Sequence, residues 1–276
     1  MYILLSVLLS ALLHASWNAI IKFGDDKFQG MFVLSIGHGV FGFFLIVIYP
    51  IPNHQSWLFL TGSVAFHMFY KYFLTLAYEK GDLSNVYPIT RGTSPILVLI
   101  ASLLALPDPL TTGQIGGIGT VGLGILFLAR GAIINKEGHI SVLYAILAAI
   151  GTAGYTIFDG LGARASGTTL GYVGWLFFLD AIIFIGGGIA LRGKRMIPKS
   201  GKDWNQGLLA GAASVGAYAI AIWAMTVAQI AIIAALREIS IIFAFIIGIL
   251  FFHEKASIQK LLPTIMVITG VVCISI

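Results

Sequence analysis

Residues 230–252 read IAIIAALREISIIFAFIIGILFF. Apart from Arg237, Glu238 and Ser240, the 23 residues of this stretch are apolar or glycine. A helix of about 20 apolar residues has the length that crosses the hydrocarbon core of a bilayer. The stretch therefore predicts a membrane-spanning helix with two adjacent charges inside it.

Nine further apolar runs of similar length precede and follow this stretch. Of the 276 residues 58% are apolar and only 10% charged, whereas a soluble domain carries about 25% charged residues. The fold class predicted is all-α, a polytopic membrane protein with ten transmembrane helices and no soluble domain. The ten helices are expected near residues 2–23, 30–49, 56–79, 84–106, 112–130, 139–163, 169–191, 204–227, 230–252 and 257–275.

Several function classes are disfavoured by the motifs. Gly117 to Gly122 fits the pattern GxGxxG, but it lies inside an apolar run with no preceding strand, so a dinucleotide site is not expected. Gly113 and Gly117 instead predict a close approach of helix 112–130 to a neighbour. The chain has no P-loop and no hydrolase motif, so we expect neither an ATP-driven pump nor an enzyme, and no cofactor. The 16 basic against 11 acidic residues lie mostly in short loops, which indicates membrane orientation and not nucleic-acid binding.

The chain repeats itself. An offset of 147 residues places Ala77 over Ala224 and Arg91 over Glu238, and in both copies a long helix meets a short turn and a helix with a charge about two turns in. The copies are residues 1–134 and 135–276. Five helices per copy is an odd number, so the second copy must enter the membrane from the opposite side. An inverted repeat of this kind is typical of alternating-access transporters with a central site near the midplane.

Loop charge predicts the orientation of the helices. Basic residues concentrate in the loops after the odd-numbered predicted helices, and the loops on the other side of the membrane hold only Arg164. Both termini are therefore expected on the non-cytoplasmic side of a membrane, most simply a bacterial inner membrane. The side taken as cytoplasmic holds Lys22, Lys27, Lys80, Arg130, Lys136, Arg192, Lys194, Arg195, Lys199, Lys202, Lys255 and Lys260.

Three motifs make the chain similar to a known family. They are Ala15-Ser16-Trp17-Asn18, the turn Ala77-Tyr78-Glu79-Lys80-Gly81 before a proline-containing helix, and His253-Glu254-Lys255. Over its whole length the chain resembles the drug/metabolite transporter superfamily, specifically its EamA-type ten-helix exporters. It departs from the family's Gly-Glu pairs, with His253-Glu254 at the second and no Glu at the first, Leu106-Pro107-Asp108.

Ionisable residues inside the apolar runs are the first candidates for a substrate site. Each costs about 3 kcal/mol or more in the membrane, so each needs a partner or a cavity. The repeat predicts a salt bridge between Arg91 and Glu238, and Arg237 must face a different way from Glu238 because neighbours on a helix point about 100° apart. The alternative is that these charges only lock helices together, and Asp180 in particular is expected to pair with a Lys or His. The five residues are Lys71, Arg91, Asp180, Arg237 and Glu238.

Two helices carry polar stripes. In helix 56–79 the stripe is His67, Lys71 and Tyr78, which suits either a substrate site or a hydrogen-bond ladder between helices. In helix 2–23, Trp17 and Asn18 lie on one face with His14 and Lys22, and the resemblance implies that Trp17 and Asn18 line the substrate cavity. Aromatic residues expected near the midplane, as a cage for a cation or a planar solute, are Tyr87, Tyr155, Tyr218 and Trp223.

Pro88 and Pro95 remove backbone donors from helix 84–106, whereas helix 230–252 has no proline. The two prolines are expected to kink this helix, and the first repeat is expected to be the half that bends.

The function predicted is secondary active transport, with export expected, of a small polar or zwitterionic metabolite such as an amino acid or amine-like compound. Proton coupling is open, and a monomer is sufficient. Alternatives are a transporter of organic cations or phosphonate-type anions, and a non-transporting membrane scaffold. The substrate-binding residues expected are Trp17, Asn18, Lys71, Tyr87, Arg91, Tyr155, Trp223, Arg237 and Glu238.

Overall fold

The computed structural model describes residues 2–23, 27–80, 83–128, 139–198, 200–252 and 261–275, and all regular structure within these ranges is helical. The α-helices are α1 (Tyr2–Phe23), α2 (Lys27–Ile48), α3 (Ser56–Lys80), α4 (Leu83–Ala105), α5 (Thr112–Leu128), α7 (His139–Ala165), α8 (Thr169–Arg192), α9 (Gly201–Val227), α10 (Ile230–Leu236), α11 (Ser240–Phe252) and α12 (Leu261–Ser275). Two 3₁₀ turns, η1 (Gly193–Met196) and η2 (Arg237–Ile239), complete the list.

Some sequence predictions lie outside the described residues. The predicted repeat boundary between 134 and 135 does, and so do Gly81 of the first turn motif and the motif His253-Glu254-Lys255. Most of the basic side chains used for the orientation are also not described, namely Lys22, Lys27, Arg130, Lys136, Arg192, Lys194, Arg195, Lys199, Lys255 and Lys260.

The helix prediction is confirmed for the described part of the chain, with ends shifted by a few residues. Seven of its helices are long and apolar enough to cross a membrane, and α5 and α12 are shorter apolar helices. The helix α3, which carries His67 and Lys71, is not among the seven. All ten predicted positions nevertheless hold helix where the structure describes them.

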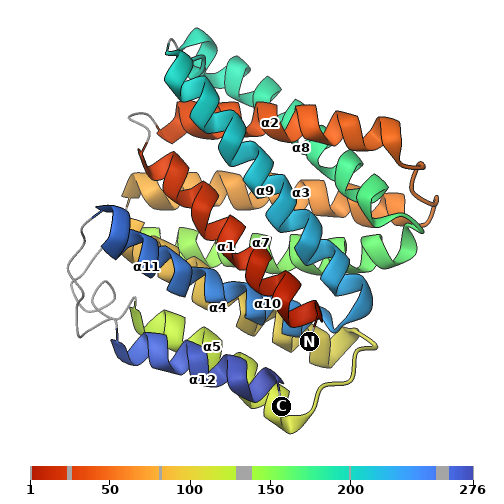
Figure 1. Ribbon diagram of the computed structural model, residues 1–276, viewed down its shortest axis with the longest axis vertical. Helices are drawn as coiled ribbons and strands as arrows, with labels where there is room; N and C mark the ends of the chain where they lie inside the picture. The colour runs from red at the N-terminus through yellow and green to blue at the C-terminus, as the bar shows by residue number, and fades with distance from the viewer. Residues whose placement is uncertain are drawn as a thin grey trace.

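The helices run across the longest axis of the molecule (Figure 1). The pair α2 and α8 lies at one end of this axis, and the pair α5 and α12 at the other. Between them α3 packs against α7, and α1 packs against α9. These pairings match the repeat, because the equivalents of α3 and α7 in the other copy are α9 and α1. Both termini lie at the same end of the helices (Figure 1).

Glycines allow the closest helix contacts. A methyl group added to Gly117 of α5 would lie 2.7 Å from the carbonyl oxygen of Gly270 on α12, so the two backbones touch. At Gly113 the same contact, to the Cys273 carbonyl, is an ordinary 3.8 Å. The predicted close approach of α5 to a neighbour is confirmed, and Gly117 is where it is tightest.

A capped turn sets where α8 starts. The Thr168 hydroxyl accepts a hydrogen bond from the amide of Gly171, which satisfies one of the free donors of the first turn. Gly167 adopts a φ of +68°, a conformation that favours glycine, directly before this cap. The reversal between α7 and α8 is thus encoded locally, which places Asp159 and Tyr172 on facing helices.

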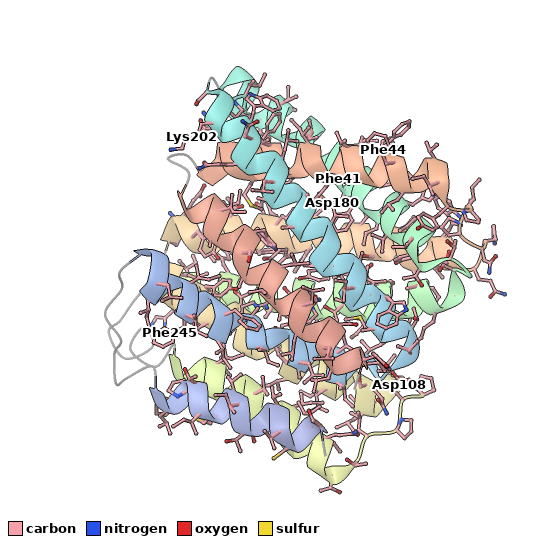
Figure 2. All side chains as sticks on the ribbon, viewed as in Figure 1. Phe41, Phe44, Asp108, Asp180, Lys202 and Phe245 are labelled. Atoms are coloured by element: carbon pink, nitrogen blue, oxygen red, sulfur yellow. The ribbon has the colours of Figure 1, made fainter. Side chains whose placement is uncertain are left out.

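The distribution of polarity is that of a membrane protein. Leu58, Leu104 and Leu191 are at least 74% exposed, and α2 turns Phe41 and Phe44 outward (Figure 2). Charged side chains are buried instead, since Asp159 is 0% and Asp180 3% exposed. In water this arrangement would be unstable, but lipid solvates the apolar surface and the buried charges pair internally.

The interrupted membrane helix lies in the second repeat. Despite Pro88 and Pro95, α4 is a single α-helix from Leu83 to Ala105. The helix predicted over 230–252 is instead divided into α10 and α11 by the 3₁₀ turn Arg237–Ile239. Both charges of this helix lie in the turn, so the interruption occurs where two buried side chains must reach different partners.

A half-buried ion pair closes the end of the molecule near the termini. Arg164 of α7 donates to both carboxylate oxygens of Asp108 at 2.8 and 2.9 Å. The same guanidinium donates to the carbonyls of Met225 and Ala228, and Asp108 accepts from the amide of Ile230 at 3.2 Å. One arginine thereby joins the α4–α5 connection and α7 to the turn between α9 and α10.

Candidate substrate site

The predicted salt bridge between the repeats is present. Arg91 Nε of α4 lies 3.0 Å from Glu238 Oε2 of η2, and the two side chains are 9% and 5% exposed. Both atoms lack hydrogen-bond geometry, so the contact is an ion pair without a directed hydrogen bond. The guanidinium also donates to Ser240 Oγ at 3.2 Å and lies 5.9 Å from the ring of Tyr87. Arg91 and Glu238 thus neutralise each other between α4 and the broken helix.

Arg237 points elsewhere, as predicted for a residue adjacent to Glu238. Its guanidinium lies 4.9 Å from the ring centre of Tyr218 on α9, and the residue is 8% exposed. Among the described side chains no carboxylate lies within ion-pair distance of Arg237. A cation–π contact supplies about 0.5–2 kcal/mol, less than a buried counter-ion supplies. Arg237 is therefore a buried cation held by an aromatic face.

Aromatic rings gather around this cation. Tyr155 of α7 stacks on His67 of α3 with ring centres 4.1 Å apart and an interplanar angle of 11°. Tyr218 meets the edges of both at 5.9 and 6.2 Å, and Tyr70 meets Tyr155 at 5.7 Å. We call Tyr70, Tyr155, Tyr218 and His67 the aromatic cluster. The charges of Arg91 and Arg237 both act on Tyr155, so the cluster and the arginines form one site.

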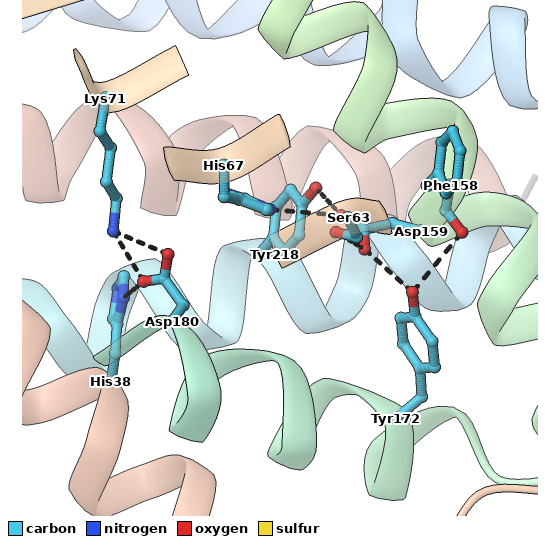
Figure 3. A network of polar contacts seen from close by, with 9 residues as sticks. All are labelled: His38, Ser63, His67, Lys71, Phe158, Asp159, Tyr172, Asp180 and Tyr218. Atoms are coloured by element: carbon cyan, nitrogen blue, oxygen red, sulfur yellow. Dashed lines mark hydrogen bonds and ion pairs between the residues drawn. The ribbon is translucent and has the colours of Figure 1, made fainter. Parts of the chain in front are cut away.

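A buried carboxylate that the sequence analysis missed lies next to this cluster. Asp159 of α7 is 0% exposed and accepts hydrogen bonds from Ser63 and Tyr218 at 2.5 Å and from Tyr172 at 3.2 Å (Figure 3). His67 Nε2 lies 3.4 Å from its second oxygen. The signal that could have found it is a single acidic residue inside the apolar run 139–163, four residues before its predicted end.

Lys71 and Asp180 form a second ion pair on the same stripe of α3. Lys71 Nζ donates to both oxygens of Asp180 at 2.7 and 2.8 Å, and it lies 4.4 Å from the ring centre of Phe184. His38 Nδ1 lies 3.7 Å from Asp180, while its Nε2 contacts Ser214 Oγ (Figure 3). The expectation that Asp180 pairs with a Lys or His is confirmed for both.

The polar stripe of α3 is a ladder between helices. Ser63, His67 and Lys71 are spaced at four residues and meet carboxylates on α7 and α8. Tyr78, predicted as part of the stripe, is 36% exposed and lies beyond it. The charge of Lys71 is neutralised by Asp180. Arg237 has no such partner among the described side chains.

The predicted residues of α1 lie close to the arginines. Trp17 Nε1 donates to His14 Nδ1 at 3.3 Å, and the Asn18 amide donates to the His14 carbonyl at 2.7 Å. His14 is within electrostatic reach of Arg91 and Arg237. Through His14, Trp17 and Asn18 are linked to the side of α1 that lies near the two arginines.

Two predicted aromatic residues differ in placement. Tyr87 lies beside Arg91 on α4 and within reach of the charges of Glu238 and Arg237. Trp223 on α9 is 39% exposed, so its ring does not lie with the buried cluster. Two of the nine predicted residues therefore lie apart from the others, because Trp223 is exposed and Lys71 belongs to the separate pair with Asp180.

The comparisons with known proteins concern the whole chain. The sequence model of the EamA-like transporter family matches residues 1–130 and 139–276. No curated protein matches the chain by sequence. A solved structure titled only "Crystal structure of protein" aligns with a TM-score of 0.78 at 15% identity, covering 98% of each chain, and this likeness concerns the fold alone. The two matched segments correspond to the two helical repeats, and the chain therefore belongs to the EamA-like transporter family, as an integral multi-pass membrane protein.

Proposed function

We propose that the chain is a secondary transporter that exports a small zwitterionic metabolite of the amino-acid type by alternating access between its two repeats. The observation that carries this proposal is Arg237, a buried cation without a carboxylate partner among the described side chains. Arg91 and Glu238 neutralise each other, so the charges of Arg91, Glu238 and Arg237 sum to one positive charge. Arg237 lacks a carboxylate within ion-pair distance among the described side chains, and an arginine binds a carboxylate through two parallel hydrogen bonds.

The aromatic cluster supports binding of the rest of such a solute. The faces of Tyr155 and Tyr218 bind an ammonium group through cation–π attraction, and their edges pack against an aliphatic or planar side chain. Trp17 and Asn18 close this region from α1, with Tyr87 beside Arg91. In this proposal Trp223 contacts the solute only along its path, and Lys71 supports the site through Asp180.

The topology belongs to the same proposal. We infer ten membrane spans in two inverted repeats, since the helix pairs α3 with α7 and α9 with α1 are equivalent under exchange of the repeats. The loop charges favour both termini outside the cytoplasm, in a bacterial inner membrane. Export is the direction implied by the resemblance to EamA-type exporters.

A set of matched ligands tests the substrate class. The purified protein is melted in detergent with an amino acid, with the amine that lacks its carboxylate, and with the acid that lacks its amine. A ligand at 100 times its Kd stabilises by about 2.7 kcal/mol, which raises the melting temperature by roughly 5–10 °C. The amino acid should give this shift, and both truncated compounds should give less.

Two variants test whether the ligand-induced shift in melting temperature depends on Arg237. Arg237→Gln should abolish the shift, whereas Arg164→Gln, an arginine outside the site, should keep it relative to its own melting temperature. An equal shift with the amine alone would favour an organic cation transporter, and a larger shift with an alkyl phosphonate would favour phosphonate-type anions. No shift and no counterflow in proteoliposomes with any of these compounds would favour the scaffold alternative.

A further inference from the structure

We propose that Asp159 and His67 form an exchange site. The pair either binds a proton or, when deprotonated, attracts the ammonium group of the substrate to the neighbouring aromatic rings. This inference rests on the proposed function and names the step that links transport to a proton gradient. It starts from the most buried carboxylate of the site, which accepts from Ser63, Tyr172 and Tyr218 on three other helices. None of these three hydroxyls carries a charge, and among the described side chains His67, at 3.4 Å, is the one basic group within ion-pair distance of Asp159.

The pair has two protonation states of similar hydrogen bonding. With one shared proton, Asp159 and His67 are neutral overall, as a carboxylate beside an imidazolium or an acid beside an imidazole. After the proton leaves, the pair carries one negative charge, and the carboxylate keeps its three hydroxyl donors. Because three hydroxyl groups donate to it, this carboxylate can lose its proton inside the protein and still have hydrogen-bond partners. The His67 side chain is 13% exposed, which gives the proton a route.

Two contacts connect this pair to the substrate site. His67 lies flat on Tyr155, so an imidazolium places its positive charge against the face that would bind an ammonium group. Tyr218 has two roles, because its hydroxyl donates to Asp159 and its ring carries Arg237. The protonation state of the pair is therefore felt on both sides of the aromatic cluster.

The sign of the coupling follows from these charges. The protonated pair is neutral overall and does not attract a cation to the Tyr155 and Tyr218 rings, whereas the deprotonated pair carries one negative charge and does. One proton leaves when one ammonium group enters, so net charge near the cluster is conserved and the exchange is an antiport. An inward proton gradient would then drive export, with the substrate carboxylate held by Arg237 throughout.

The other charged groups near His67 do not compete for this role. Asp180 lies within electrostatic reach of His67, but Lys71 neutralises it through two hydrogen bonds, and His38 stands on its far side. Glu238 is neutralised by Arg91. Of the three buried carboxylates described around the cluster, Asp159, Asp180 and Glu238, only Asp159 has no lysine or arginine within ion-pair distance.

Proton release on binding is the direct test. The wild-type protein in weakly buffered detergent solution with a pH-sensitive dye receives the amino acid identified by the melting experiment. We expect about one proton released per bound molecule, and an affinity that falls about tenfold per pH unit below the titration range of the pair. His67→Gln keeps a hydrogen-bond donor but cannot take up a proton, so the number of protons released per bound amino acid should fall well below one, whatever affinity remains.

Counterflow separates this inference from the proposed function. Solute exchange at equal pH needs no net proton flow, so Asp159→Asn and His67→Gln should each reduce accumulation driven by a pH gradient by a larger factor than they reduce counterflow. Asp108→Asn, a carboxylate at the end of the molecule, should keep both. Wild-type protein without counterflow would refute the proposed function, whereas wild-type counterflow with unchanged proton release in both site variants would refute the exchange site alone.

Discussion

The Arg91–Glu238 ion pair allows a stability prediction with a magnitude. The charged atoms lie 3.0 Å apart on side chains that are 9% and 5% exposed. At an effective dielectric constant of about 20 their attraction is about 5 kcal/mol, and removal of one partner from a buried pair costs about 3–5 kcal/mol. Arg91→Gln and Glu238→Gln should each lower the melting temperature by roughly 6–20 °C.

The double variant tests whether the two charges act on each other. Arg91→Gln with Glu238→Gln leaves two neutral amides and no unpaired charge, so its loss should be at most about half the sum of the single losses. Melting is followed by size-exclusion chromatography of heated, detergent-purified protein. Ser240→Ala, which removes only the 3.2 Å hydrogen bond to Arg91, serves as control and should cost no more than about 3 kcal/mol. Strictly additive losses in the double variant would refute an energetic pairing of the repeats at this point.

Three shorter predictions concern the remaining contacts. Burial raises the pKa of Asp108, but its hydrogen bonds from Arg164 and from a backbone amide outweigh this and hold the pKa below the ordinary carboxyl value. The ionised Asp108 therefore stabilises the fold fully above about pH 4, and this stabilisation is lost as the pH falls through the folded-state pKa. The difference in melting temperature between wild type and Asp108→Asn should shrink below about pH 4. A difference that stays constant with pH would contradict this. Lys71→Met leaves a buried carboxylate without its cation and should lower the melting temperature by roughly 6–20 °C, and a change of only a few degrees would show that the pair contributes little. Gly117→Ala places a methyl group 2.7 Å from a backbone oxygen and should destabilise by about 1–3 kcal/mol, whereas Gly116→Ala, which meets nothing within 4 Å, should be neutral when both are melted side by side.

The helices and their equivalence were predictable because lipid imposes strict requirements. A segment that crosses the membrane must be apolar for about 20 residues and must satisfy its own backbone, so its position is visible in the sequence. The offset of 147 residues then related Arg91 to Glu238, and the structure places these two side chains in contact. A charge in such a segment needs a partner, and few partners were available.

The interruption of the helix over 230–252 was not predicted from the sequence. Prolines mark positions where a backbone donor is missing, but α4 accommodates Pro88 and Pro95 without a break in its helical assignment. The break in the second repeat occurs at Arg237 and Glu238. Glu238 pairs with Arg91, whereas Arg237 lies over the ring of Tyr218. Side-chain demands of this kind depend on neighbours and leave no local mark in the sequence.

The role of each charge was the least predictable part of the site. Lys71 was a reasonable candidate for a substrate carboxylate until the structure placed it 2.7 Å from Asp180. Asp159 was overlooked, although it has more hydrogen-bond donors than any other carboxylate described near the cluster. A sequence shows that a charge must be compensated, but it does not show by which residue.

The sequence by itself determined that this chain is an all-helical membrane protein with two related halves, that it resembles EamA-type transporters, and that a few charges lie within its helices. These properties follow from hydropathy and spacing, which are local. Only the tertiary structure decided that Arg91 and Lys71 are neutralised, that Arg237 rests on Tyr218, and that Asp159 meets His67. The physical reason is that pairing depends on distances between helices far apart in the chain, and the packing of small residues such as Gly117 and Gly270 sets those distances.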